Sequence, residues 1–296
     1  MSGAYDWARV RARIPEELKV SAVVVSYRTG PVLFDCLHAL LADPDIAEVV
    51  LVDNGNPAAT LERIEALKAD SGGRLKVTGG GVNRGYSAGV NLGAKTASGA
   101  RLLVINPDAV LRPGSAAAFE AAFEGAAEPA IVGGRIYGVD GAEQRGARRR
   151  HPTLARAFRT MIGRRGVNRM HTPPPDEPVA MEAVSGALMY FSRRGFDRLG
   201  GFDEGYFLHV EDFDICRRAE ADGGSVIYTP HAAAMHYGGT SDAPSLTVER
   251  YKAAGFKRYF AKFASSRAER FAILACGPMI DLALWARAML RGARRR

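Results

Sequence analysis

The strongest constraint on the fold comes from an apolar run that ends abruptly in polar residues. Leu102 to Ile105 is continuously aliphatic, and Asn106, Pro107 and Asp108 follow directly. Such a run is typical of a strand buried on both faces of a parallel sheet, and proline ends its hydrogen-bond ladder. In open α/β sheets ligands bind beyond the carboxyl ends of strands, so Asp108 is a candidate for chemistry. The alternative is a turn that only terminates the strand.

Two earlier segments repeat this strand signature. Lys19 to Ser26 is rich in valine, and Ile46 to Val52 ends at Asp53. Helical patterns over Val32 to Leu41 and Leu61 to Leu67 separate the strands. This alternation predicts an α/β fold with a mostly parallel, Rossmann-like sheet flanked by helices. Because parallel strands end at one edge, a nucleotide-sized ligand is expected there.

A glycine-rich segment precedes the opening strand. It runs from the Gly79–Gly81 turn into Asn83 and Arg84, but it carries neither the P-loop nor the dinucleotide signature. Arg84 could meet a diphosphate, and backbone N–H groups from Gly85 to Gly89 could assist at a helix start. The alternative is that these glycines only allow close packing.

The second half of the chain adds two carboxylates, a histidine and a glycine. Glu211 and Asp212 fall in the first turn of a helix predicted from His209 to Glu220, where the helix dipole favours acids whatever the function. His236 follows another predicted strand, although a lone histidine is more often structural. Gly186 lies in a strand predicted around Ser185 to Ala187, and a glycine there indicates close approach of another group.

Charge and cysteine content restrict the partners and the compartment. The 40 Lys and Arg against 32 Asp and Glu give a net charge of +8, which favours an anionic partner. Cys36, Cys216 and Cys276 are too widely spaced for a zinc site or a disulfide framework, so we expect packing residues in a reducing cytosol. The first residues lack an apolar stretch, and no secretory signal is expected.

Residues 145–178 form a basic, proline-rich segment that we expect to be a loop or lid. Loops of this length are often functional, although a solvated run of arginines is the usual alternative. Binding to nucleic acid would require interleaved aromatic residues, and in this segment only Phe158 is available. We therefore expect no nucleic-acid partner.

Composition and sequence pattern divide the chain into three regions: a tail at 1–18, a domain at 19–240 that contains the candidate catalytic residues, and a C-terminal helical segment at 241–296. The uncharged run from Phe271 to Ile280 is shorter than the roughly 20 residues of a membrane span. Trp285 and the terminal arginines instead favour an interfacial element on anionic lipid. The alternative is a helix packed on the catalytic domain or in a dimer, which leaves a homo-oligomer open.

Seven motifs occur in order: VVVSY (23–27), VDNG (52–55), NRGYSAGVNLG (83–93), INPD (105–108), SGALM (185–189), GGFDEGYFLHVEDFDICRR (200–218) and the histidine at 236. Their joint order resembles family 2 glycosyltransferases, and more narrowly the bacterial rhamnosyltransferase and galactofuranosyltransferase branch. The resemblance covers roughly residues 20–240. It implies a GT-A fold and inverting transfer of a rhamnose-like or galactofuranose-like sugar from a dTDP- or UDP-linked donor, with Mg²⁺ or Mn²⁺ as cofactor.

The resemblance also implies roles for individual residues. The residues expected along the donor nucleotide and diphosphate are Ser26, Asp53, Asn83, Arg84, Asn91, Asp108 and Gly186. Asp108 matches the second acid of the DxD metal motif, and His236 matches a residue that completes the metal shell in some relatives. Asp212, with Glu211 beside it, matches the general base. Asn106 stands where a stricter motif has Asp, which removes one charge, and His209 stands where Tyr is frequent.

The implied activity is transfer of a sugar to a glycan or a polyprenyl-diphosphate-linked acceptor in bacterial cell-envelope polysaccharide synthesis. The enzyme would be cytoplasmic and peripheral on the inner face of the membrane. Such chemistry needs one base on the acceptor hydroxyl and one means of stabilising the leaving diphosphate. A sugar-nucleotide pyrophosphorylase is the enzymatic alternative, but Val25 to Thr29 lacks its glycine-rich signature. A non-catalytic sugar-nucleotide-binding scaffold would not require Asp108, Asp212 and His236.

Overall fold

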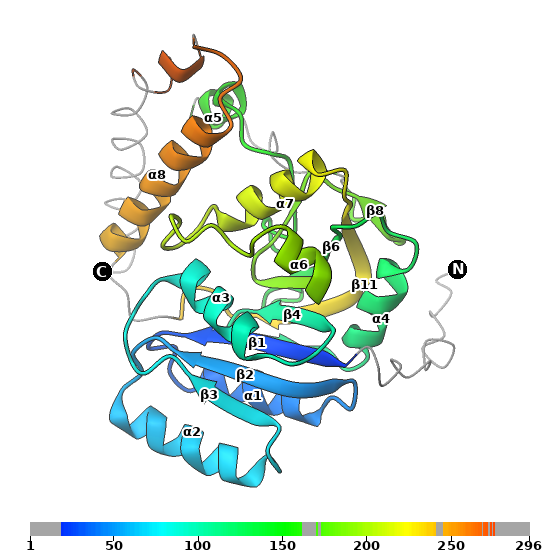
Figure 1. Cartoon of the computed structure of the whole chain (residues 1–296), viewed down its shortest axis with the longest axis vertical. Helices are drawn as coiled ribbons and strands as arrows, with labels where there is room; N and C mark the ends of the chain where they lie inside the picture. Colours follow the sequence, from blue (N-terminus) through cyan, green and yellow to red (C-terminus); the bar gives the residue numbers. More distant parts are fainter. Residues whose placement is uncertain are drawn as a thin grey trace.

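One mixed sheet with helices packed on it dominates the structure (Figure 1). The computed structural model describes residues 19–161, 170, 173–240, 245–267, 269–271, 273 and 275. The strands are β1 (Val20–Ser26), β2 (Ile46–Asp53), β3 (Leu75–Thr78), β4 (Arg101–Ile105), β5 (Ala109–Leu111), β6 (Ile131–Tyr137), β7 (Arg148–Arg149), β8 (Val179–Ala180), β9 (Ala183–Val184), β10 (Leu188–Ser192) and β11 (Val226–His236). The helices are α1 (Val32–Ala42), α2 (Ala58–Asp70), α3 (Tyr86–Thr96), α4 (Ser115–Phe123), α5 (Leu154–Met161), α6 (Arg193–Arg198), α7 (Glu211–Ala221) and α8 (Ser245–Lys262). The tail predicted for residues 1–18 lies outside the described residues.

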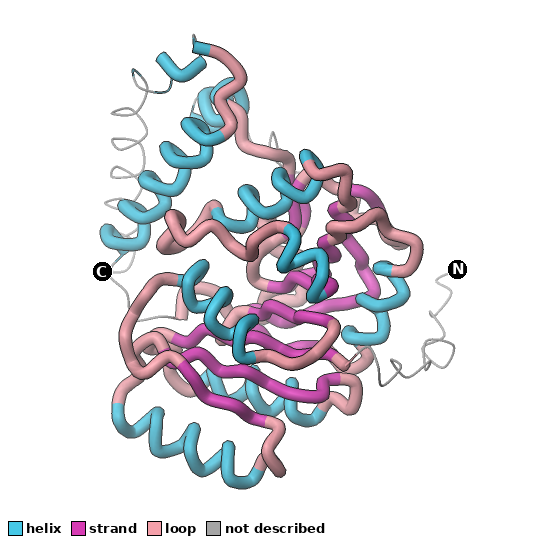
Figure 2. Tube along the Cα trace, viewed as in Figure 1, coloured by secondary structure: helices cyan, strands magenta, loops and turns pink. Residues whose placement is uncertain are grey.

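The sheet has the order β3-β2-β1-β4-β10-β6-β11-β5, and β8 adds to β11 (Figure 2). β1 pairs in parallel with β2 on one side and β4 on the other, so that Val23 lies between Val50 and Val104. These valines are fully buried, as expected for a strand covered on both faces. β10 runs antiparallel to both β4 and β6, while β6 and β11 are parallel. The predicted mostly parallel α/β sheet is confirmed.

This strand arrangement collects the polar strand ends at one edge of the sheet. β1, β2, β4, β6 and β11 point the same way, so Ser26, Asp53 and His236 fall at their shared carboxyl edge. Because β10 is inverted, its amino end reaches the same edge and brings Gly186 there. Asp108 follows β4 directly and joins this group.

Glycines on α3 let this helix lie very close to the sheet, in front of β1 in Figure 1. A Cβ atom on Gly89 would come within 2.7 Å of the Val25 side chain. The glycines at 89 and 93 therefore serve close packing, which was one of the two interpretations of this motif. A phosphate-binding role for the start of α3 stays a prediction.

Two predictions about local structure are wrong. Gly186 lies in the turn between β9 and β10 and not inside a strand, because its N–H group bonds to Asp212 instead of a neighbouring strand. The basic segment contains β7 and α5 and is not wholly a loop. Its Arg148 is buried and paired with Glu143 at 2.8 Å, so the alternative of a solvated charge run is wrong for Arg148.

The segment before α7 has an unusual backbone. The helix begins at Glu211, two residues later than predicted, because His209 and Val210 have φ angles of 68° and 76°. A β-branched residue in this left-handed region is strained. A Cβ atom on Gly255 of α8 would lie 3.0 Å from the His209 carbonyl oxygen, so α8 is packed directly on this loop.

α8 is further attached through ion pairs and ring stacking. Arg258 and Lys262 both bind Asp203, at 2.8 Å and 2.7 Å, and Tyr251 stacks on Phe207 at 4.3 Å between ring centroids. This part of the C-terminal segment is thus a helix packed on the catalytic domain. Within the described part of the chain, none of the helices is long and apolar enough to cross a bilayer.

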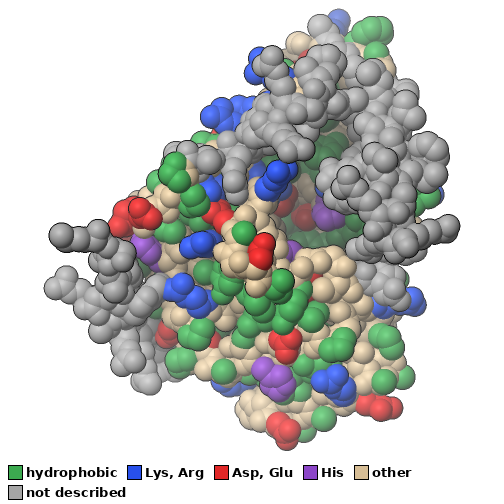
Figure 3. Space-filling view, turned by 180° about the vertical axis from the view of Figure 1, so that it is seen from behind, with side chains coloured by type: hydrophobic (Ala, Val, Ile, Leu, Met, Phe, Trp, Pro, Cys, Tyr) green, Lys and Arg blue, Asp and Glu red, His purple; other side chains and the backbone are tan. Residues whose placement is uncertain are grey.

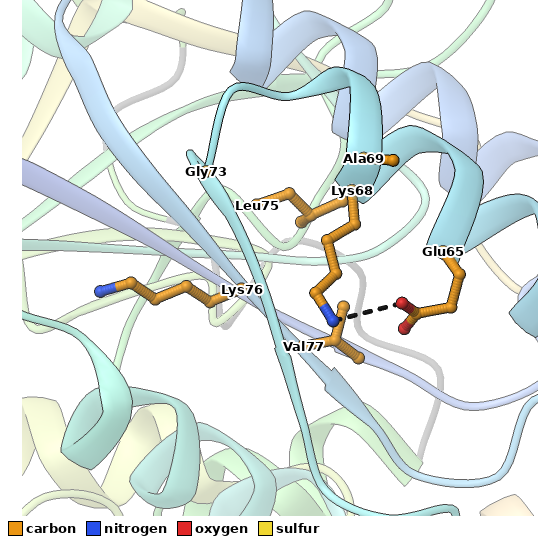
Figure 4. A pocket seen from close by; sticks show the side chains of 7 residues that line it. All are labelled: Glu65, Lys68, Ala69, Gly73, Leu75, Lys76 and Val77. Carbon is orange, nitrogen blue, oxygen red and sulfur yellow. Dashed lines mark hydrogen bonds and ion pairs between the residues drawn. The ribbon is translucent and has the colours of Figure 1, made fainter.

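A shallow groove of about 610 Å³ lies between α2 and the edge strand β3 (Figure 4). Its lining residues are Glu65, Lys68, Ala69, Gly73, Leu75, Lys76 and Val77. Lys68 is paired with Glu65 at 3.2 Å and Lys76 with Glu48. None of the predicted site residues lines this groove, so it is separate from the candidate site at the carboxyl edge of the sheet.

Candidate active site

The two predicted metal ligands lie side by side. Ala109 of β5 pairs with His236 of β11, and this register brings the preceding Asp108 against the histidine. Asp108 Oδ1 is 3.1 Å from His236 Nε2, and Thr240 donates to the other carboxylate oxygen at 3.0 Å. Burial alone would raise the pKa of Asp108, but the hydrogen bond and charge of His236 lower it, so Asp108 is a carboxylate at neutral pH.

The surroundings of His236 suit a cation ligand. Gln144 is fixed by donating from Nε2 to the His236 carbonyl oxygen, which leaves its Oε1 to accept from His236 Nδ1 at 2.8 Å. With Nδ1 engaged by Gln144, Nε2 is the ring nitrogen that lies against Asp108, and it is the nitrogen that would face a cation bound between the two side chains. Asn106 Nδ2 also lies 3.2 Å from Nε2. Gln144 escaped the sequence analysis, because nothing local links it to position 236.

A divalent cation fits this pair only as part of a sparse protein shell. Among the described residues, no group of three or more His, Cys, Asp or Glu side chains could hold a metal ion. Asp108 and His236 would therefore supply two ligands, and substrate diphosphate oxygens and water would complete the shell. Mg²⁺ and Mn²⁺ sites commonly have this composition.

Asp53 forms the nucleotide side of the predicted site. Its Oδ1 accepts from the backbone N–H groups of Gly55 and Asn56 and from the Asn56 side chain, at 2.8 to 3.0 Å. Ser26 is fully buried and donates to Asn56 Oδ1 at 2.9 Å. Ser26 therefore supports the turn that holds Asp53, and its expected contact with the nucleoside stays a prediction.

Arg84 and Asn83 shape the loop before α3. Arg84 Nη2 donates to the Gly79 carbonyl oxygen at 2.6 Å, and Asn83 Oδ1 accepts from the Gly85 N–H group at 3.1 Å. Asn54 donates to the Gly85 carbonyl at 3.0 Å and joins this loop to the end of β2. These contacts place the loop at the carboxyl edge, and contact of Asn83 and Arg84 with a donor stays a prediction.

Asn91 connects α3 to the turn that leads toward α7. Its amide donates to the Phe202 carbonyl oxygen at 2.8 Å and to Glu204 at 3.0 Å, and its oxygen accepts from the Phe202 N–H group. All three contacts hold this turn. The expected place of Asn91 along the nucleotide stays a prediction.

The predicted base, Asp212, is held by three donors. Its Oδ2 accepts from the Gly186 N–H group at 3.0 Å and from Arg149 Nη2 at 2.5 Å, and its Oδ1 accepts from the Phe213 N–H group at 2.8 Å. Tyr86 donates to the Gly186 carbonyl at 2.8 Å and fixes the same turn. Gly186 thus donates a hydrogen bond to the predicted base, and its contact with the donor stays a prediction. Arg149 and Tyr86 escaped the sequence analysis.

The adjacent carboxyls at 211 and 212 have opposite pKa shifts. Burial and the charge of Asp212 raise the pKa of Glu211 to about 8. Burial also opposes ionisation of Asp212, but the charge of Arg149 and the hydrogen bonds to Oδ2 and Oδ1 lower its pKa. At neutral pH the pair therefore carries one proton, on Glu211. Neighbouring carboxyls separated in this way are typical of acid and base assignments in active sites.

Several buried polar atoms around this edge lack a hydrogen-bond partner among the described residues. They are Asn54 Oδ1, Arg84 Nε, Ser87 Oγ, Arg149 Nε and Glu211 Oε2. Unpaired buried polar atoms are rare in folded proteins, and a ligand bound at this edge would give these atoms partners. Figure 3 shows a hollow on the rear face with acidic and histidine side chains in its depth.

The family model described as "Glycosyltransferase like family 2" matches residues 15–257. The chain is a member of this glycosyltransferase family. It is 28% identical over 239 residues to the N-acetylglucosaminyl-diphospho-decaprenol L-rhamnosyltransferase of Mycobacterium tuberculosis, covering 73% of this chain and 75% of the relative. It is also 36% identical over 76 residues to the rhamnosyltransferase WbbL of Escherichia coli K12, covering 24% of this chain and 28% of the relative. The predicted rhamnosyltransferase-like branch is confirmed.

Solved structures give the same fold. GalNAc-T7 with UDP, GalNAc and Mn²⁺ aligns with a TM-score of 0.61 and 20% identity, over 86% of this glycosyltransferase and 52% of that chain. The mannosyltransferase PcManGT from Pyrobaculum calidifontis, in complex with GDP-Man and Mn²⁺, aligns with a TM-score of 0.58 and 16% identity, over 93% and 75%. The predicted GT-A fold is confirmed.

Replacement of Asp108 by Ala should abolish any Mn²⁺-dependent increase in affinity for UDP or dTDP. The fold should be retained, because the residue lies in a turn at the sheet edge. The measurement is the shift in unfolding temperature with each nucleotide, with and without Mn²⁺, since binding to the folded state stabilises it by mass action. Asp70→Ala, at the exposed end of α2, is the control. Equal nucleotide affinity of the wild type with and without Mn²⁺ would contradict the metal assignment.

Replacement of Glu211 by Gln should make the free energy of unfolding decrease less as the pH rises. The folded-state pKa of Glu211 is raised from 4.5 to about 8. Its contribution to stability is fully present below pH 4.5 and is lost as pH rises through 8. Glutamine stays neutral throughout, so the wild type should lose more stability than Glu211→Gln over this window.

Unfolding temperatures measured across that pH range test the prediction, with the exposed Glu62→Gln as control. Parallel curves for the wild type and Glu211→Gln would show that Glu211 is ionised in the folded protein.

Proposed function

We propose that this glycosyltransferase transfers a rhamnose-like or galactofuranose-like sugar, with inversion, from a dTDP- or UDP-linked donor to a polyprenyl-diphosphate-linked acceptor. The observation that carries the proposal is the Asp212 carboxyl group, anchored by Gly186 and Arg149 at the edge that also holds Asp108 and His236. The Mycobacterium relative, whose name states a diphospho-decaprenol acceptor and an L-rhamnosyl group, supports the choice of substrates.

Asp212 acts as the general base in this proposal. Its carboxylate takes the proton of the acceptor hydroxyl while the acceptor oxygen forms a bond to the anomeric carbon of the donor. The bond between that carbon and the diphosphate oxygen breaks, and the diphosphate leaves with the electron pair. Because attack and departure occur on opposite faces of the sugar, the anomeric configuration inverts. One base is sufficient, and no covalent nucleophile is assigned.

Asp108 and His236 are the residues that would hold Mg²⁺ or Mn²⁺. A bound divalent cation supplies positive charge that stabilises the leaving diphosphate. The protonated Glu211 beside Asp212 keeps a second negative charge away from the base and from the anionic donor. The turn around Asp53, Asn83 and Arg84 is proposed to receive the nucleotide and its diphosphate.

Neither alternative function is favoured. Membership of a glycosyltransferase family argues against a sugar-nucleotide pyrophosphorylase. A non-catalytic scaffold would have no need for a buried carboxylate whose pKa is held low by a dedicated arginine.

Replacement of Asp212 by Asn should reduce sugar transfer by about 10² to 10⁴, the usual contribution of a positioned base. Asparagine keeps the shape and one acceptor oxygen but has almost no basicity, so donor affinity should change little. The measurement is turnover with dTDP-L-rhamnose and a short-chain polyprenyl-diphospho-N-acetylglucosamine, with donor affinity measured in parallel. Glu211→Gln is the matched control and should cost less. Wild-type turnover in Asp212→Asn would show that another residue is the base.

We further propose that the enzyme works at the cytoplasmic face of the membrane, where a polyprenyl acceptor lies. The net charge of +8 would favour anionic lipid. Phe271 is 74% exposed, and Arg267 and Arg270 beside it are exposed. Ile273, in contrast, is packed into the core, so a test of membrane contact by deletion must leave this residue in place.

Deletion of residues 281–296 should weaken binding to phosphatidylcholine vesicles that contain phosphatidylglycerol, because it removes Trp285 and the terminal arginines. Co-sedimentation measures the binding, and vesicles of phosphatidylcholine alone show how much depends on charge. A variant with Gln in place of the arginines at 291 and 294–296 separates charge from the aromatic contribution. Undiminished sedimentation of the deletion variant would place the membrane contact elsewhere.

A further inference from the structure

Arg149 of the basic segment contacts Asp212, the proposed base, which lies 63 positions later in the sequence. Arg149 lies on β7, which pairs with β9 so that Arg149 is opposite Ala183. Successive side chains of a strand point to opposite faces. Arg148 accordingly turns to Glu143, whereas Arg149 turns to Asp212.

The Arg149 guanidinium is fixed before any substrate arrives. Nη2 donates to the Val184 carbonyl oxygen at 2.7 Å as well as to Asp212 at 2.5 Å. The guanidinium carbon lies 4.0 Å from the centre of the Phe213 ring, in a cation–π contact, and the side chain is only 17% exposed. A stacked, planar guanidinium keeps its direction better than a flexible ammonium group would. These contacts hold the guanidinium against the Asp212 carboxylate.

These contacts make the two oxygens of Asp212 unequal. A carboxylate oxygen offers about two lone-pair sites. Among the described residues, Oδ2 has two donors, Arg149 and the Gly186 N–H group, whereas Oδ1 has one, the Phe213 N–H group. The free lone pair is therefore on Oδ1, and Oδ1 is the oxygen available for an acceptor proton.

We propose that Arg149 is a positioning residue for the reaction, which orients Asp212 so that Oδ1 is the oxygen that takes the acceptor proton. This inference rests on the proposed function, because it assumes that Asp212 is the base. Arg149 acts through Asp212 and is not itself assigned a contact with substrate.

Other titratable groups of the described chain also lie near Asp212. Glu211 is adjacent on α7, Tyr86 approaches from α3 through the Gly186 turn, and Cys216 lies one turn further along α7. Asp214 is already paired with Arg218 and Lys262. Among the described residues, Arg149 is the cation in direct contact with Asp212, and its charge lowers the pKa of that carboxyl.

The test compares Arg149→Gln, Arg149→Lys and the exposed neighbour Arg150→Gln, which changes the net charge equally. Transfer from dTDP-L-rhamnose to a short-chain polyprenyl-diphospho-N-acetylglucosamine is followed as a function of pH. Arg149→Gln should lower kcat by about 10²-fold, the scale of a misplaced catalytic group, and leave the KM for the donor unchanged. Loss of the cation raises the pKa of Asp212, so the acid limb of the kcat profile should move to higher pH.

Arg149→Lys keeps the positive charge but loses the planar, stacked geometry. It should show a reduced kcat with the acid limb of the pH profile unshifted. If thermal unfolding shows that Arg149→Gln is not folded, Arg149→Lys alone tests the proposal. Arg150→Gln should match the wild type. Wild-type kcat in Arg149→Lys, or a kcat and acid limb in Arg149→Gln that match the wild type, would overturn the proposal.

A double variant separates this inference from the proposed function. If Arg149 acts through Asp212, adding Arg149→Gln to Asp212→Asn should cost little more than Asp212→Asn alone, because residues that act as a unit are not additive. Losses that multiply would show that Arg149 acts on substrate, and the inference would fail while the proposed function stood. Wild-type turnover in Asp212→Asn alone would overturn the proposed base and the inference with it.

Discussion

The inverted strand β10 is the constraint on which the site depends. It is inserted between β4 and β6, and Leu188 pairs with Ile105, so its amino end lies where β4 ends. The Asn106 N–H group then donates to the Ala187 carbonyl at 3.0 Å, and Gly186 is carried to the start of α7. A parallel strand in this place would present its carboxyl end instead, and the turn that holds Asp212 would be absent from this edge.

Burial makes neighbouring carboxyls at the start of α7 behave differently. Each loses hydration, which favours the neutral acid. Only Asp212 receives a guanidinium and two backbone donors in return, and the negative charge it then carries makes ionisation of Glu211 harder still. One cation therefore sets both protonation states. The helix dipole favours acidic residues in the first turn of α7, but it does not distinguish Glu211 from Asp212.

Local rules single out candidate residues in the sequence, but they do not show which side chains from distant segments come into contact. Asp53 and Asp108 are candidates because each stands at the end of a buried strand. The contact of Asp108 with His236 depends on the pairing of β5 with β11, and that of Arg149 with Asp212 on the pairing of β7 with β9. Such pairings leave no local signal. Asn91 and Ser26 show a second limit, because a motif position does not reveal whether a side chain faces a ligand or the loop beside it.

The left-handed backbone at His209 and Val210 ties the end of the predicted catalytic domain to α8. This strained loop immediately precedes Glu211, and Gly255 of α8 packs against it. A helix that covers a strained segment supplies contacts that offset the cost of its geometry. We infer that a boundary at residue 240 would cut through one folding unit, which extends through α8 to the buried Ile273. Evolutionary replacement of the C-terminal segment, for instance to change the surface that it meets, would then be free only beyond this residue.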